Sequence, residues 1–183
     1  MKVLIPLAPG VEELEAISVV DVLRRGKVEV VTAAVMNSKT VMTAHGVVWQ
    51  ADALWTQIES DLDSFDAIVL PGGGAGTEAL MADKRVISAI KLFNRNEKFV
   101  CAICAAPMVL AKAEVLKDRE ATCYPTCMEA LGSSYRDAPV IVDGNIITSQ
   151  GPGTALLFAL VLLCHFVGEP MARQVAGGML TSF

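Results

Sequence analysis

Short runs of consecutive apolar residues recur along the chain, as is typical of strands buried on both faces of a sheet. They cover residues 1–8, 28–35, 66–70, 99–103 and 121–124. Two further pairs of runs predict hairpins, 40–42 with 46–49 and 140–142 with 146–148. The turn dipeptide Asp143-Gly144 closes the second hairpin.

The segments between these runs show the three- and four-residue spacing of helices. In residues 12–25, the positions Leu14, Ile17, Val20 and Leu23 predict a buried helix face. Further helices are expected in a pair that ends at Asn96, from Ala105 onward, and over 154–167 and 170–177.

Strands that alternate with helices predict an α/β sandwich with a mainly parallel central sheet. We expect residues 1–183 to form a single domain. In sheets of this kind, functional residues collect at the carboxyl ends of the strands.

Composition narrows the classes of function. Hydrophobic residues make up 53% of the 183 residues, which suits a buried sheet or a subunit interface. The net charge of −5, without a basic block, argues against nucleic acid and membranes as partners. The longest apolar run, 155–164, is too short to span a bilayer and predicts a core helix. Five cysteines without a secretory signal favour free thiols in the cytoplasm.

Cys104 lies where a buried strand meets the start of a helix that has Pro107 in its first turn. Free backbone N–H groups and the positive end of the helix dipole favour the thiolate at this position. The arrangement is that of a nucleophile elbow, with cysteine in place of serine. A buried structural thiol is the alternative, and it fits Cys101, inside the strand, better than Cys104.

The cysteines and histidines also allow other chemistry. Cys101 and Cys104 spell C-x-x-C, and Cys123 and Cys127 spell C-x-x-x-C, patterns that zinc sites and dithiols also use. Side chains three apart on a strand point to opposite faces, which separates the first pair of sulfur atoms. We therefore expect no metal and no cofactor. Neither histidine directly follows Cys104, which argues against a cysteine protease of the usual kind.

A glycine-rich segment, 71–76, follows the strand 66–70. It lacks the Lys-Ser/Thr pair of a phosphate-binding loop, and a flexible turn is the simplest interpretation. Alternatively, the glycines let the N–H of Gly73 approach a reacting oxygen. With the N–H of Ala105 it would then form an oxyanion hole.

Three acidic residues, Glu12, Glu13 and Glu15, open the first helix. Acidic side chains complement the macrodipole at a helix N-terminus, which accounts for Glu12 and Glu13. Glu15 is expected to point inward, toward the strand ends. A desolvated carboxyl group beside a thiol would keep its proton and donate a hydrogen bond to the sulfur.

In five motifs, which occur in the same order, the sequence resembles the ThiJ/PfpI superfamily. Within it, the chain is similar to the branch of the Parkinson-disease-associated deglycase. The motifs are Leu7–Ala16, Asp21–Gly26, Val69–Gly73, Ala102–Pro107 and Thr148–Thr154.

The resemblance implies a flavodoxin-like three-layer sandwich, related to class I glutamine amidotransferases, that usually forms a homodimer. It implies that Cys104 is the reactive, oxidisable cysteine, that Glu15 is its protonated partner, and that Gly73 and Ala105 supply the backbone donors. The expected substrate contacts are Gly72, Tyr124, His45 and Gly151. Tyr124 replaces a histidine that relatives often carry near the thiol, and His45 replaces an arginine from the facing subunit.

Two functions follow from the resemblance. The first is a glutathione-independent glyoxalase or protein deglycase that acts on small aldehydes or glycated protein side chains. It would use a Cys104 hemithioacetal, with Glu15 as proton shuttle. The second is a non-catalytic oxidative-stress sensor or redox-regulated chaperone that uses oxidation of Cys104. A dimeric scaffold with a vestigial site is a third possibility, whereas the protease branch carries histidine where this chain has Ala105.

Overall fold

The computed structural model describes residues 1–183, which fold around one seven-stranded sheet. Its strand order is β5-β2-β1-β6-β7-β9-β8, and every neighbouring pair is parallel except β8 with β9. The strands are β1 (Lys2–Leu7), β2 (Glu29–Ala34), β5 (Ala53–Leu54), β6 (Ala67–Leu70), β7 (Phe99–Ile103), β8 (Val140–Asp143) and β9 (Ile146–Ser149). A separate antiparallel pair consists of β3 (Thr40–Met42) and β4 (Val48–Gln50).

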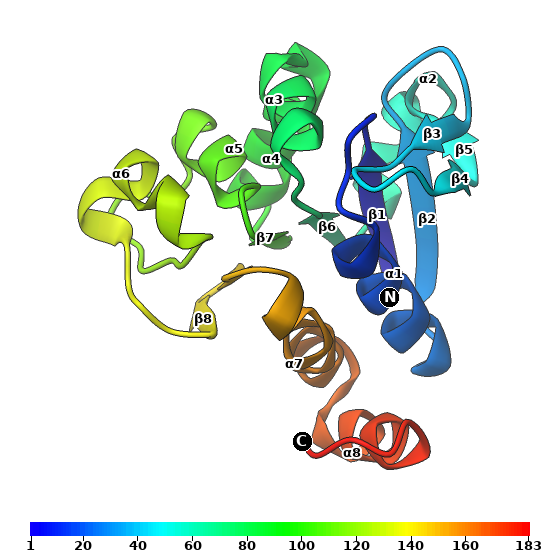
Figure 1. Ribbon diagram of the computed structural model, residues 1–183, viewed down its shortest axis with the longest axis vertical. Coiled ribbons are helices and arrows are strands. Elements are labelled where there is room, and N and C mark those ends of the chain that lie inside the picture. Colours follow the sequence, from blue (N-terminus) through cyan, green and yellow to red (C-terminus); the bar gives the residue numbers. More distant parts are fainter.

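Helices cover both faces of the sheet, which gives three layers (Figure 1). The helices are α1 (Glu13–Arg25), α2 (Trp55–Ile58), α3 (Gly74–Ala82), α4 (Lys84–Arg95), α5 (Pro107–Lys112), α6 (Met128–Leu131), α7 (Ala155–Val167) and α8 (Glu169–Gly178). Short 3-10 helices cover 59–64, 125–127, 132–134 and 152–154. The two hydrophobic cores divide the side chains of each strand, because successive side chains point to opposite faces. Val3, Ile5 and Leu7 pack with α1, α7 and α8, whereas Leu4 packs with α4 and α5 on the other face.

The predicted strands and helices are largely confirmed, including the Asp143-Gly144 hairpin and the core helix α7. The predicted strand at 121–124 is wrong, since Ala121 makes only an isolated bridge with Tyr135. The segment instead bonds to the ends of other strands. Thr122 N–H donates to Thr148 Oγ1 at 2.9 Å, and Tyr124 N–H donates to the Cys104 carbonyl at 2.8 Å.

The predicted inner face of the first helix is partly wrong. Leu14 is 50% exposed and Ile17 is 47% exposed, and they lie beside Val47 and Trp49 on the surface. The helix instead buries another face, which includes Glu15, Ala16 and Val19. An apolar stripe is therefore present on each of two faces of α1, and only one of them packs within the chain.

Four strands bring the predicted site segments to one edge of the sheet. The pairing of Leu70 with Ala102, and of Ala102 with Thr148, aligns the carboxyl ends of β6, β7 and β9. β1, beside β6, ends at the same edge and leads into α1. The predicted convergence at the carboxyl ends is confirmed. No helix of the structure is both long enough and apolar enough to cross a membrane.

Candidate active site

Cys104 occupies the predicted elbow. β7 ends at Ile103, and Cys104 has φ +65°, a left-handed conformation that is uncommon for residues other than glycine. Its N–H donates to the Ser149 carbonyl at 3.0 Å, and its carbonyl accepts from Tyr124 N–H at 2.8 Å. These two bonds hold the strained backbone, and they leave the side chain half-buried at the edge of the sheet.

Glu15 reaches this edge from the first turn of α1 and is fully buried. Its Oε2 accepts the N–H of Gly72 at 2.8 Å, whereas Oε1 has no hydrogen-bond partner among the surrounding nitrogen and oxygen atoms. Its side chain also lies within interaction distance of the Cys104 thiol. The predicted inward orientation of Glu15 is therefore what the structure shows.

The carboxyl and the thiol form one coupled titrating pair. Burial raises the pKa of Glu15 to about 7, and the negative charge of Glu12 contributes to this increase. The hydrogen bond from Gly72 N–H acts in the opposite direction and lowers the pKa. Burial also raises the pKa of Cys104, to about 12, and the neighbouring carboxylate of Glu15 contributes. The pair thus resists carrying two negative charges, and the thiolate depends on the proton of Glu15.

This coupling corrects one expectation. The helix after the elbow begins only at Pro107 and is six residues long, so its dipole does not outweigh burial at Cys104. The groups that do favour the thiolate are the backbone N–H groups of Gly73 and Ala105, which lower the pKa of the thiol. The role of these two N–H groups as an oxyanion hole stays a prediction.

Gly72 and Gly73 permit these close contacts because neither position has room for a side chain. A Cβ at Gly72 would lie 2.7 Å from the Cβ of Cys104 and 2.8 Å from Glu15 Oε2. Gly73 has φ +91°, and a Cβ there would collide with the backbone of Gly10 and Glu12. The N–H of Gly72 is bonded to Glu15, and the expected substrate contact at Gly72 stays a prediction. The place of Gly72 in the structure is that of a positioning residue.

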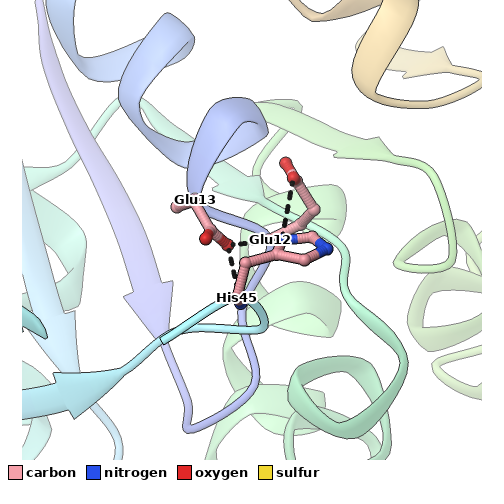
Figure 2. Close-up of side chains that lie close together, drawn as sticks. All are labelled: Glu12, Glu13 and His45. Atoms are coloured by element: carbon pink, nitrogen blue, oxygen red, sulfur yellow. Dashed lines mark hydrogen bonds and ion pairs between the residues drawn. The ribbon is translucent and has the colours of Figure 1, made fainter. Parts of the chain in front are cut away.

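The other expected substrate contacts separate into two groups. Tyr124 and Gly151 line one small pocket of about 160 Å³, which Cys104 does not line, and a Cβ on Gly151 would lie 3.2 Å from the tyrosine ring. His45 lies elsewhere on the rim, in the turn between β3 and β4, and contacts Glu12 and Glu13 (Figure 2). Within one chain, no contact joins His45 to Cys104.

The remaining cysteines lie away from the elbow or deeper in the core, and all five thiols are free. Cys101 is fully buried inside β7, and burial raises its pKa. Both observations agree with a structural role for this thiol. Burial and the nearby Cys127 raise the pKa of Cys123 to about 11.

The sequence predicted only an interaction with the helix dipole for Glu12, and the structure shows a further role at the start of α1. Glu12 caps α1, because its Oε2 accepts the N–H of Glu15 at 2.7 Å, and its own N–H donates to the Gly72 carbonyl at 3.0 Å. The three-residue spacing between Glu12 and Glu15 is the only signal of this cap in the sequence.

The fold and this site define a class of α/β sandwich proteins that carry a cysteine elbow beside a buried carboxyl group at the carboxyl edge of a parallel sheet. The profile of the DJ-1/PfpI family matches residues 1–165, and the chain belongs to this family. This finding confirms the resemblance that the motifs indicated.

Relatives and solved structures agree with this assignment. Protein DJ-1 homolog B of Arabidopsis thaliana is 39% identical over 181 residues, which cover 98% of this chain but 41% of that longer protein. Protein dj-1beta of Drosophila melanogaster is 38% identical over 183 residues, covering 98% of this chain and 97% of the relative.

Oxidized DJ-1 of Toxoplasma gondii superposes with a TM-score of 0.96 at 34% identity, over 100% of this chain and 99% of that one. DJ-1beta of Drosophila melanogaster superposes with a TM-score of 0.95 at 38% identity, over 100% and 98% of the two chains. The flavodoxin-like fold is thereby confirmed.

Proposed function

We propose that this protein is a stress-response enzyme that converts small reactive carbonyl compounds, in the manner of a glutathione-independent glyoxalase or a protein deglycase. Family membership supports the stress-response role. The observation that carries the enzymatic part is the pairing of Cys104 with buried Glu15, beneath the backbone donors of Gly73 and Ala105. A thiol, a proton carrier and an oxyanion site are the groups that aldehyde chemistry requires.

The proposed reaction uses methylglyoxal and water and releases lactate. The sulfur of Cys104 bonds to the aldehyde carbon, while Glu15 receives the thiol proton and passes it to the developing alkoxide. The N–H groups of Gly73 and Ala105 stabilise that oxygen. Glu15 then takes the C–H proton of the hemithioacetal and returns it to the neighbouring carbon, while the hydroxyl proton moves to the oxygen of that carbon, which gives a lactoyl thioester. Water hydrolyses the thioester and frees the Cys104 thiol.

The direct test is methylglyoxal consumption with lactate formation by the purified protein. Cys104→Ser should abolish both, and Glu15→Gln should abolish lactate while leaving the fold intact. Cys127→Ser is the matched control, because Cys127 is also half-buried but lies outside the elbow. Equal rates for wild type and Cys104→Ser would overturn the enzymatic proposal.

A redox sensor or redox-regulated chaperone is the second candidate. It is favoured by the half-buried position of Cys104, which admits peroxide, and by backbone donors that would stabilise an oxidised sulfur. Intact-mass measurement under graded peroxide should show two added oxygen atoms on Cys104 before any other thiol reacts. Oxidation that begins at Cys127 instead would reject this candidate.

We further propose a cytoplasmic homodimer of this single domain, which would cover the apolar surface of Leu14, Ile17, Val47 and Trp49. About half of the surface of Leu14 and of Ile17 is exposed in one chain. An Ile17→Glu variant should shift the mass measured by light scattering from dimer to monomer. A monomeric wild type would contradict this part of the proposal.

A further inference from the structure

Glu12, Glu13 and His45 form a compact cluster on the rim of the sheet, apart from Cys104. Figure 2 shows His45 in contact with both carboxylates. His45 Nδ1 lies 3.2 Å from Glu13 Oε2 and 3.8 Å from Glu12 Oε1, and the three ligand atoms all lie within 4.8 Å of one another. We propose that this cluster binds a divalent transition-metal ion of the Zn²⁺ class.

The spacing suits such an ion. Zinc bonds to imidazole nitrogen and carboxylate oxygen at about 2.0–2.2 Å, so ligand atoms around a tetrahedral ion are roughly 3.4 Å apart. The separations of 3.2 and 3.8 Å in the cluster bracket this value. One nitrogen and two oxygens form a mixed ligand set that suits zinc and its neighbours better than calcium. Water would occupy the open coordination positions.

The charges in the cluster are unbalanced. His45 is the only basic group within ion-pair distance of either carboxylate, so no lysine or arginine competes for them. Only 8% of the surface of Glu12 is exposed, yet its Oε1 makes no hydrogen bond and faces His45 Nδ1. Oε1 stays accessible at the rim with no donor bound to it, so a cation that enters the cluster can reach it.

The backbone around the cluster holds the three ligands in place. Ala44 N–H donates to the Val11 carbonyl at 2.8 Å, which ties the turn of His45 to the segment that carries Glu12. A helix N-terminus opposes a cation, but Glu12 Oε2 already accepts the N–H of Glu15 there. Binding would therefore need only small shifts of the two carboxylates.

The chain contains only two histidines, which makes the test specific. In protein labelled with ¹⁵N in its imidazoles, equimolar Zn²⁺ should shift the Nδ1 resonance of His45 and leave His165 unchanged. Nδ1 of His165 already contacts the Val161 carbonyl at 2.9 Å, so this residue is the internal control. Replacement of each histidine by glutamine assigns the signals.

Calorimetric titration of Zn²⁺ supplies the affinity. Glu13→Gln should weaken binding by about tenfold or more, since loss of even an outer-shell partner weakens metal sites by about 10- to 100-fold. His165→Gln should bind as wild type does. His45 resonances that stay in place with Zn²⁺ bound would overturn the proposal, as would affinity that Glu13→Gln preserves and Cys104→Ser abolishes.

Discussion

Replacing Glu15 with glutamine isolates the free-energy cost of an ionised carboxyl group in the core. Glu15 is fully buried, and burial raises its pKa from the ordinary 4.5 to about 7. An acid with a higher pKa in the folded state retains its proton while the unfolded chain loses it, so stability falls as the pH rises between these values. One pKa unit is about 1.4 kcal/mol, and the ionised group therefore destabilises the fold by about 3 kcal/mol above pH 7.

Glutamine has nearly the same shape, is neutral at every pH and keeps an oxygen for the N–H of Gly72. We therefore expect the two proteins to differ little near pH 4.5, and Glu15→Gln to be more stable by about 3 kcal/mol at pH 8. Urea unfolding followed by circular dichroism across this range measures the difference. All other titrating groups are common to both proteins. Among them, the thiol of Cys104 is the one whose pKa depends directly on the carboxyl group of Glu15.

The same comparison in a Cys104→Ser background removes that thiol and leaves the expected trend in place. A stability difference between the protein with Glu15 and its Glu15→Gln variant that is constant from pH 5 to pH 8 would refute the reasoning. It would mean that the carboxyl group has the same proton affinity in the folded and unfolded chains, and that burial does not govern it.

Three further substitutions test the framework of the site. Gly72→Ala forces a methyl group against Cys104 and Glu15, and should lower the unfolding free energy by about 1–3 kcal/mol as well as activity. Cys104→Gly should be more stable than Cys104→Ala by about 1 kcal/mol in denaturant titrations, because only glycine relieves φ +65°; equal stability would exclude backbone strain at the elbow. Thr148→Val leaves the buried N–H of Thr122 without its acceptor and should cost about 1–3 kcal/mol. Thr77→Val is its control, since the Thr77 hydroxyl has no partner to lose.

Much of the fold was predictable because the signals are local. Consecutive apolar residues mark β6 and β7, and the change from strand to helix former around Pro107 marks the elbow at Cys104. Parallel strands place their carboxyl ends together whatever the details of packing, so the meeting of Cys104 with the glycine-rich segment also followed.

The buried face of α1 and the protonation of Cys104 depend on tertiary contacts, which the hydrophobic periodicity of the sequence does not reveal. Leu14 and Ile17 fit an inward helix face as well as Val19 and Val20 do, and only packing against α7 decides which face is buried. The thiolate expectation failed for the same reason. Local backbone groups favour a charged sulfur at Cys104, but burial by distant segments and the carboxyl group of Glu15 oppose it.

Glu12 shows how a residue with a purely local signal acquires a second role. As an N-cap it fixes the N–H of Glu15, and through its own N–H it holds Gly72, whose N–H in turn fixes the carboxyl group of Glu15. Its other carboxylate oxygen faces His45, which lies 33 positions later in the sequence. A ligand bound by the rim cluster of Glu12, Glu13 and His45 would therefore contact Glu12, the same side chain that positions Glu15. The two sites share a residue, and a variant at Glu12 should disturb both, whereas Glu13→Gln should disturb only the rim cluster.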